Sequence, residues 1–125
     1  MEKALTALVV EDNKSVRELI VIALKRIPGL EAIEANHGVE ALEKLEGIQP
    51  DIILTDIHMP VMDGMTLLKH VRANESLAKV PIVIITTEHA AADKARAIAL
   101  GATSYITKPI RAPRLLKEVR NLLKV

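Results

Sequence analysis

The stretch "IILTDIHMPVMDG", residues 52–64, decides the fold. Its first part is an apolar run rich in β-branched residues, which is typical of a parallel strand covered on both faces by helices. The run stops at Asp56, and a turn containing Pro60 follows at once. A buried strand that ends on an ionisable group indicates a functional site only if other apolar runs also end on polar residues.

Five short apolar runs alternate with segments of helical periodicity along the whole chain. The runs predict strands at Leu5–Val10, Leu30–Ala35, Asp51–Thr55, Pro81–Ile85 and Thr103–Ile106. The segments between and after them predict helices at 14–27, 38–46, 64–73, 90–100 and 112–124. In the first helix the expected apolar stripe is Val16, Leu19, Ile20, Ala23, Leu24 and Ile27. This alternation predicts an α/β fold, with a doubly wound, mostly parallel five-stranded sheet, five helices and right-handed crossovers.

Gly and Pro residues agree with these limits. Pro28 and Gly29 are expected to stop the first helix, and Gly101 stands where a C′ glycine belongs. Pro113 suits the first turn of the last helix.

Length and composition limit the functions that this chain can have. The 125 residues, 1–125, are expected to form one domain, and the core must be aliphatic because Tyr105 is the only aromatic residue. A net charge of +1 indicates no nucleic-acid partner, and the lack of cysteine excludes disulfides and thiol chemistry. The first apolar stretch is too short for a signal peptide or a membrane span, so we expect a soluble cytoplasmic protein with no membrane partner.

Polar residues follow four of the five predicted strands. They are Glu11 and Asp12 after the first, Asp56 after the third, Thr86 and Thr87 after the fourth, and Lys108 and Pro109 after the fifth. In open α/β sheets the carboxyl ends of the strands form the working edge, so these groups are expected to converge. Three close carboxylates repel one another, and Mg²⁺, which prefers oxygen ligands, relieves this repulsion. One carboxylate can then attack phosphorus, while Lys108 and Thr86 stabilise phosphoryl oxygens.

Each of these residues also has an ordinary interpretation when taken alone. Asp56 can cap a helix or form a turn, Glu11 can be solvated, and Thr86 can be a plain strand residue. Lys108-Pro109 can be only a turn, whereas the functional interpretation adds a cis peptide bond that aims the lysine. Tyr105 by itself is expected to pack at a strand end. The combination, more than any single residue, indicates the site.

Four motifs carry a resemblance to a known family. They are "VVEDN" at 9–13, "DIHMPVMDG" at 56–64, "ITT" at 85–87 and "GATSYITKP" at 101–109. In this order and spacing the whole chain resembles a receiver domain of bacterial two-component response regulators, of the single-domain, CheY-like kind. The resemblance, and not the sequence pattern, supplies the flavodoxin-like strand order 2-1-3-4-5.

The resemblance implies a role for each matching residue. Asp56 would be the phosphoacceptor and a Mg²⁺ ligand, Asp12 would bind Mg²⁺ directly, and Glu11 would act mainly through a metal-bound water. The backbone carbonyl of His58 would supply another metal ligand. The Glu-Asp pair at 11–12 replaces the more common Asp-Asp pair of the family.

The remaining matching residues would respond to the phosphoryl group. Lys108 would bridge to it, and the Thr86 hydroxyl would move toward it while the Tyr105 ring turns from an exposed to a buried position. His58 and Glu88, which lie two residues after Asp56 and Thr86, are hypothesised to set the lifetime of the phosphorylated state.

The resemblance also implies the partners. The phosphoryl group would come from a histidine kinase or a histidine phosphotransfer domain, and segment 88–124 would bind a downstream target protein. The last helix is rich in basic residues. Such a face is typically exposed to solvent, and the alternative is that an acidic partner protein binds there. We expect a monomer or weak dimer that catalyses only its own phosphotransfer and dephosphorylation. No DNA-binding or catalytic output module is expected.

Three other functions fit the sequence less well. A Mg²⁺-dependent phosphohydrolase with an aspartate nucleophile would have an acid at position 58, where this chain has His58, and would need room for a substrate cap. A nucleotide- or flavin-binding domain would need a glycine-rich loop after the first strand, whereas residues 11–14 lack glycine. A phosphoacceptor histidine, with His70 as the best candidate, is less favoured than Asp56.

Overall fold

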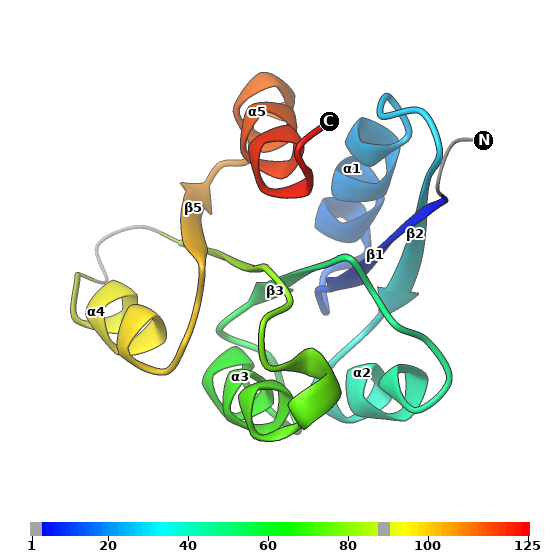
Figure 1. The fold of residues 1–125 in the computed structure, drawn as a ribbon. Helices are drawn as coiled ribbons and strands as arrows, with labels where there is room; N and C mark the ends of the chain where they lie inside the picture. Colours follow the sequence, from blue (N-terminus) through cyan, green and yellow to red (C-terminus); the bar gives the residue numbers. More distant parts are fainter. Residues whose placement is uncertain (1–3, 88–90) are drawn as a thin grey trace.

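A computed structural model describes residues 4–87 and 91–125. Five strands form one parallel sheet in the order β2-β1-β3-β4-β5 (Figure 1). Their bounds are Leu5–Val10 for β1, Leu30–Ala35 for β2, Ile52–Asp56 for β3, Ile82–Thr87 for β4 and Ser104–Lys108 for β5. The predicted doubly wound, flavodoxin-like α/β fold is confirmed.

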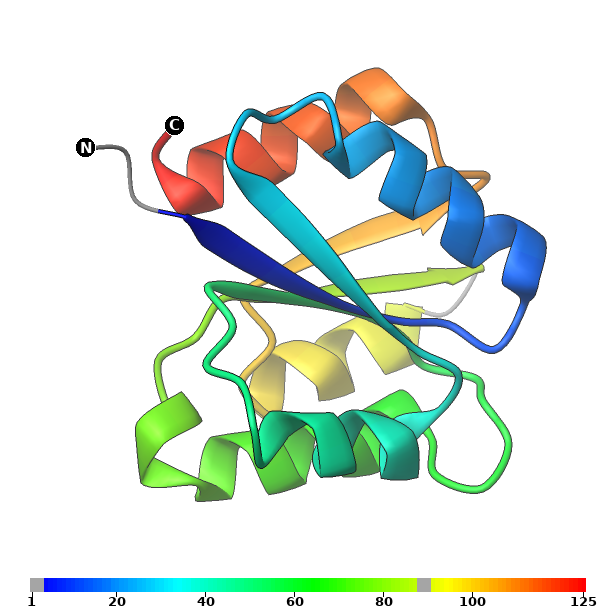
Figure 2. The same cartoon turned by 90° about the vertical axis from the view of Figure 1, so that its right-hand side faces the viewer.

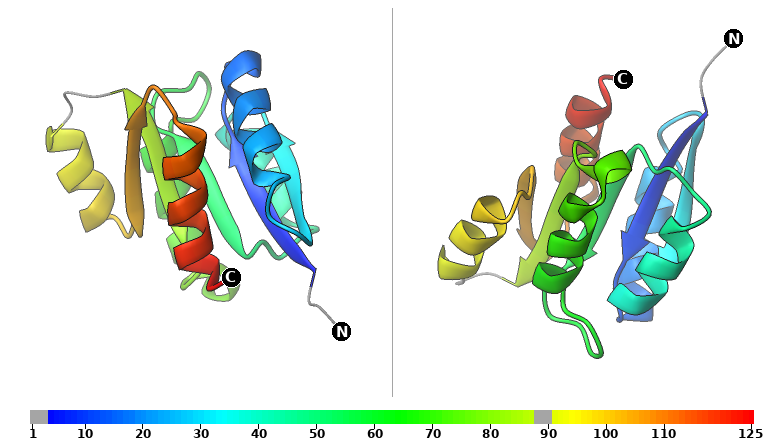
Figure 3. Two further views of the ribbon diagram at one scale, coloured as in Figure 1. Left: turned by 90° about the horizontal axis from the view of Figure 1, so that it is seen from above. Right: turned by 60° about the horizontal axis from the view of Figure 1, so that its bottom comes forward.

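Helices cover both faces of the sheet. Their bounds are Lys14–Leu24 for α1, Gly38–Leu45 for α2, Gly64–Ala73 for α3, Ala91–Ala99 for α4 and Ala112–Leu123 for α5. Figure 2 shows α1 and α5 on one face of the sheet and α2, α3 and α4 on the other. Viewed from above and from below, the sheet separates the same two layers of helices (Figure 3).

Strand side chains alternate between two aliphatic cores. In β1, Ala7 and Val9 belong to the cluster under α1 and α5, whereas Leu8 and Val10 belong to the cluster under α2, α3 and α4. This two-residue period explains why the central strands carry apolar residues at successive positions, since both faces of the sheet are covered. Burial of these chains, at roughly 25 cal/mol per Å² of apolar surface, is the main force that assembles the layers.

β1 and β2 have the predicted bounds, whereas β3, β4 and β5 reach further toward the carboxyl edge than the sequence predicts. Asp56 is the last residue of β3 and pairs in register with Ile85, and Lys108 ends β5 opposite Thr87. A polar side chain at a strand end leaves the backbone ladder intact, because the ladder uses only main-chain groups. Asp56 and Lys108 are therefore held by the sheet itself and not by the loops after it.

Two expectations for α1 are wrong. The helix ends at Leu24, three residues before the predicted limit, because short turns take over there: Arg26 N–H donates to Ala23 and Ile27 N–H to Leu24. Leu19, expected in the buried stripe, is 46% exposed. The buried line is the narrower one formed by Ile20, Ala23, Leu24 and Ile27.

Other local features agree with the sequence or add to it. Gly101 has a φ of +109° after α4, and the Ala102 N–H donates to the Ala97 carbonyl, as expected for a C′ glycine. Pro113 lies in the first turn of α5 as predicted. A 3₁₀ turn at Glu75–Leu77 was not predicted, since three residues are too few to show periodicity. Within the described ranges, no helix combines the length and apolar character needed to cross a bilayer.

Asp63 caps α3 and gives a testable contribution to stability. Its Oδ1 accepts a hydrogen bond from the Thr66 N–H at 2.8 Å. Asp63→Ala is expected to lower the free energy of unfolding by about 1 kcal/mol in urea denaturation at neutral pH, and Asp63→Asn to lose much less.

The cap also has a predictable pH dependence. The Thr66 backbone hydrogen bond holds the pKa of Asp63 below its ordinary value. The charged cap therefore stabilises the fold above the unfolded-state pKa, and this stability is lost as the pH falls through the folded-state pKa. The difference in the free energy of unfolding between the native chain and Asp63→Ala should become smaller as the pH falls. A difference that stays constant from about pH 7 to about pH 3 would contradict this account.

Candidate functional site

Three carboxylates meet at the carboxyl edge of the central strands. Glu11 directly follows β1, Asp12 comes next, and Asp56 ends β3. One oxygen from each residue lies within 4.8 Å of the oxygens of the other two. Because Val10 pairs with Thr55, the next residues on the two strands, Glu11 and Asp56, lie level with each other. The register of β1 and β3 thus builds the cluster.

The Asp56 carboxylate is held from two sides. Its Oδ1 accepts backbone hydrogen bonds from Ile57 at 2.7 Å and from His58 at 3.3 Å. Its Oδ2 accepts a hydrogen bond from Lys108 Nζ at 3.0 Å. The side chain is only 7% exposed, so its orientation is set by these contacts.

Lys108 joins two of the three acids. Its Nζ lies 2.8 Å from Glu11 Oε1, a carboxylate oxygen with no hydrogen bond of good angle among the described residues. The charge attraction at this distance does not depend on that angle. Burial acts to lower the pKa of Lys108, but its contacts with Glu11 and Asp56 outweigh burial and raise the pKa above its usual value. Lys108 is therefore the cation of the site.

Glu11 is the most deeply buried of the acids, with 2% of its side chain exposed. Burial raises the pKa of this carboxyl, the contact with Lys108 opposes that rise, and the negative charge of Asp56 adds to it. Asp12 is exposed at the rim of the cluster. A buried acid and an exposed acid thus flank Asp56.

Thr86 lies on the neighbouring strand and carries an unusual hydroxyl. The residue is fully buried, and its Oγ1 has no hydrogen-bond partner among the described residues. Thr86 follows Ile85, the register partner of Asp56. A buried hydroxyl without a partner costs about 1–3 kcal/mol, so its position next to the acids has a stability cost unless a ligand accepts the hydrogen bond.

The loop from Ile57 to Asp63 closes on the site through Gly64. The Gly64 N–H donates to the Ile57 carbonyl at 2.8 Å. A Cβ on Gly64 would lie 2.1 Å from the Asp56 carbonyl oxygen. Only glycine lets α3 start this close to the backbone of Asp56. At the tip of the loop, Val61 adopts a φ of 71°, which is uncommon for a β-branched residue.

The last predicted site features lie on β5 and on α3. The Lys108–Pro109 peptide bond is cis. Tyr105 packs, partly buried, against the core under α2, α3 and α4, and Lys94 Nζ lies 5.5 Å from its ring centroid. His70 is exposed in the last turn of α3, whereas the first turn of that helix borders Asp56. His70 is therefore not part of the acid cluster.

Sequence reasoning missed one contact near the site and one group of contacts at the far end of α3. The imidazole Nε2 of His58 lies 3.5 Å from Asp93 Oδ2, in the first turn of α4. The Arg72 guanidinium donates to the Gly101 carbonyl at 2.9 Å, and to those of Leu77 and Ala78 at 3.1 Å each. Neither Asp93 nor Arg72 lies in one of the four motifs, since each is an ordinary charged residue on a helix. Glu88, named with His58 in the sequence analysis, lies outside the described residues.

Comparison with known proteins assigns the family. The family model described as "Response regulator receiver domain" matches residues 7–120. The chain belongs to this family. Among curated relatives, this receiver domain is 41% identical over 112 residues to chemotaxis protein CheY1 of Helicobacter pylori strain J99, covering 89% of the chain and 90% of CheY1. It is 40% identical over 114 residues to the CheY homolog of Campylobacter jejuni strain 81-176, covering 89% of the chain and 85% of the relative.

Solved structures agree with this assignment. The receiver domain is similar to a putative response regulator from Chloroflexus aurantiacus, with a TM-score of 0.92, 32% identity and coverage of 98% and 100% of the two chains. The receiver domain of sensor histidine kinase PA1611 from Pseudomonas aeruginosa superposes with a TM-score of 0.88 at 26% identity, covering 98% and 100%. That structure has a magnesium ion coordinated in its active site cleft.

Gly64→Ala tests the packing of the loop against Asp56. The new methyl group would collide with backbone and not with a flexible side chain, so the free energy of unfolding is expected to fall by about 1–3 kcal/mol in urea. Gly47→Ala is the matched control, because its Cβ would meet only the Lys44 carbonyl at an ordinary 3.9 Å. Equal stability of the two variants would show that the backbone of Asp56 leaves room for a methyl group at position 64.

Proposed function

We propose that this receiver domain is a phosphorylation-activated switch whose phosphoacceptor is Asp56. It accepts a phosphoryl group from a phosphohistidine of a sensor kinase or a phosphotransfer domain, in a Mg²⁺-dependent reaction. It then changes the α4-β5-α5 surface and binds a target protein. The observation that carries this proposal is the cluster of Glu11, Asp12 and Asp56 with Lys108 held between two of the acids.

The donor set fits a hard divalent cation. Three carboxylates face one ammonium group, so negative charge is in excess, and every donor of the cluster is an oxygen. Mg²⁺ is bound in proteins by one or two carboxylates together with waters and phosphate oxygens. Asp12, Asp56 and the His58 carbonyl would hold the ion, with Glu11 acting through a water. When bound, Mg²⁺ would neutralise charge on the acids and on the phosphoryl oxygens.

The chemistry on Asp56 is a phosphoryl exchange. A carboxylate oxygen of Asp56 attacks phosphorus, forming an O–P bond while the P–N bond of the phosphohistidine breaks. The donor nitrogen keeps the electron pair of that bond and takes a proton from solvent. The backbone N–H groups of Ile57 and His58 fix the carboxylate during attack, and Lys108 Nζ is close enough to neutralise the incoming oxygens.

The switch would use the buried Thr86 hydroxyl. The phosphoryl group offers new acceptor oxygens, and Thr86 has a donor with no partner among the described residues. Movement of Thr86 toward the phosphate would leave space into which the Tyr105 ring can turn. A nearly complete shift of such an equilibrium needs about 5.5 kcal/mol of differential interaction, which charge-assisted contacts from Thr86 and Lys108 can largely supply.

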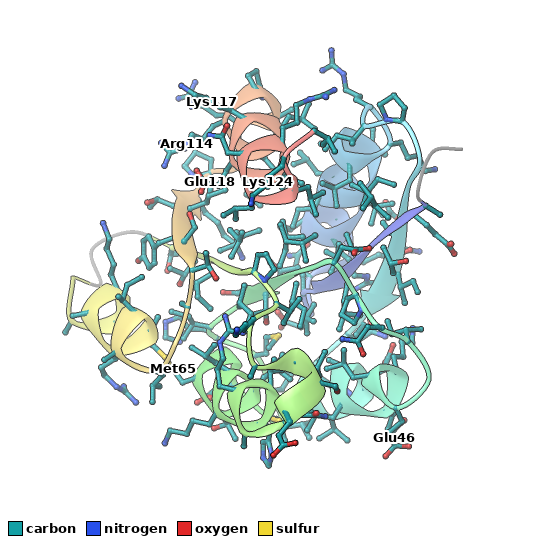
Figure 4. All side chains as sticks on the ribbon, in the orientation of Figure 1. Glu46, Met65, Arg114, Lys117, Glu118 and Lys124 are labelled. Carbon is teal, nitrogen blue, oxygen red and sulfur yellow. The ribbon has the colours of Figure 1, made fainter. Side chains whose placement is uncertain are left out.

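The proposed target surface is basic. Figure 4 shows Arg114 and Lys117 on α5, and Lys124 directly after it, with their side chains on the outside of the molecule. Lys94 and Arg96 are exposed on α4. Ile98, also on α4, is 47% exposed. A partner with acidic groups around an apolar residue would complement this face.

The family assignment favours the switch over a Mg²⁺-dependent phosphohydrolase. Position 58, where the phosphohydrolase mechanism needs a second acid, is His58, whose side chain contacts Asp93 on α4. The proposed activity is therefore limited to the chain's own phosphorylation and dephosphorylation.

Acetyl phosphate tests the phosphoacceptor directly. The native chain should gain one phosphoryl group by intact mass in the presence of Mg²⁺, and little or none after metal removal. Asp56→Asn should abolish incorporation, because an amide oxygen is a poor nucleophile, and Asp63→Asn is the matched control that should be labelled normally. Labelling that persists in Asp56→Asn, or that does not need the metal, refutes the proposal.

His58 is proposed to influence the lifetime of the phosphorylated state, together with Glu88. Replacing the imidazole in His58→Ala should change the rate of phosphate release after removal of acetyl phosphate. The control is His70→Ala, an exposed histidine at the far end of α3. A release rate equal to that of the native chain would exclude a role for His58.

A further inference from the structure

A contact between His58 and Asp93 crosses the edge of the candidate site. His58 lies in the loop directly after β3, and Asp93 lies in the first turn of α4, which follows β4. Since β3 and β4 are adjacent in the sheet, the contact links the loop after β3 to the helix that follows β4. The two side chains meet at 3.5 Å, with 64% of His58 and 26% of Asp93 exposed.

Exposed pairs of this kind contribute little to stability, so the effect of the contact lies in where it holds the imidazole. A free histidine at 64% exposure samples several rotamers, whereas a carboxylate on α4 favours the one that points toward α4. Either an imidazolium or a neutral imidazole with its proton on Nε2 is attracted to Asp93.

The same His58 is tied to the phosphoacceptor through its backbone. Its N–H donates to Asp56 Oδ1 at 3.3 Å, while its ring contacts Asp93. The residue thus spans from Asp56 to α4 along the side of the site next to β4. A water that approaches a phosphoryl group on Asp56 from this side meets the imidazole.

We infer that Asp93 is a positioning residue that, through His58, holds the imidazole at the mouth of the site and restricts the access of water to phosphorylated Asp56. The inference rests on the proposed function of Asp56. The reaction that it slows is hydrolysis: a water oxygen attacks phosphorus, the O–P bond to Asp56 breaks, and inorganic phosphate leaves with regeneration of the carboxylate. Asp93 touches none of the reacting atoms.

The way α4 is attached to the rest of the domain supports a role for Asp93 in linking the site to this helix. Among the described residues of α4, only Ala97 is fully buried in the core. The first turns of the helix are held instead by polar contacts, from Asp93 to His58 and from Lys94 to the Tyr105 ring. The contact through Asp93 thus joins the site to the helix that carries part of the proposed target surface.

The test is a double-mutant cycle on the rate of phosphate release. The native chain, Asp93→Ala, His58→Ala and the double variant are phosphorylated with acetyl phosphate and Mg²⁺, freed of the donor by desalting, and followed by intact mass. Asp93→Ala should accelerate release about threefold, the rate equivalent of losing one exposed charged contact. His58→Ala should accelerate it at least as much, and the double variant should match His58→Ala.

Matched variants separate positioning from other effects. Asp93→Asn keeps an oxygen that accepts from the imidazole and should restore most of the native lifetime. Glu43→Ala, which removes an exposed acid from α2, should leave the rate unchanged. Tyr105→Phe tests whether Asp93 acts through the tyrosine: the effect of Asp93→Ala should persist in that background.

The outcomes are distinguishable. If the native chain is not phosphorylated on Asp56, the proposed function fails and this inference fails with it. If the chain is phosphorylated but Asp93→Ala has the native release rate, or if the effects of the two single substitutions multiply in the double variant, only the role of Asp93 is overturned.

Discussion

The mutual repulsion of Glu11, Asp12 and Asp56 is the constraint on which the rest of the structure depends. A parallel sheet brings the ends of its central strands together, so acids that end β1 and β3 are forced within 4.8 Å of one another. Burial makes the repulsion stronger, since the interior screens charge less than water does. Lys108 relieves only part of it, which leaves an excess of negative charge that a bound cation could neutralise.

The loop after β3 turns this charged edge into a site of defined shape. Asp63 caps α3, Gly64 lets that helix start against the backbone of Asp56, and the N–H groups of Ile57 and His58 fix the carboxylate. The loop also has a positive φ at Val61, which is uncommon for a β-branched residue. The local structure is thus organised around one side chain.

The surface that would report on phosphorylation is held differently from the site. β5 is integrated in the sheet and supplies both Lys108 and Tyr105. α4, by contrast, is anchored in the core chiefly by Ala97 among its described residues, and polar contacts hold its first turns. A helix attached in this way needs little free energy to shift, which is the property that a phosphorylation-driven switch requires.

The sequence by itself determined how strands and helices alternate along the chain, the two-sided burial of the sheet and the identity of the acids at its edge. It did so because periodicity and strand ends are local properties. It did not determine that Leu19 is exposed, that Lys108 contacts both Glu11 and Asp56, or that His58 meets Asp93. Those facts depend on strand register and helix placement. Only the tertiary structure decides them, because each joins residues whose separation along the chain says nothing about their distance in space.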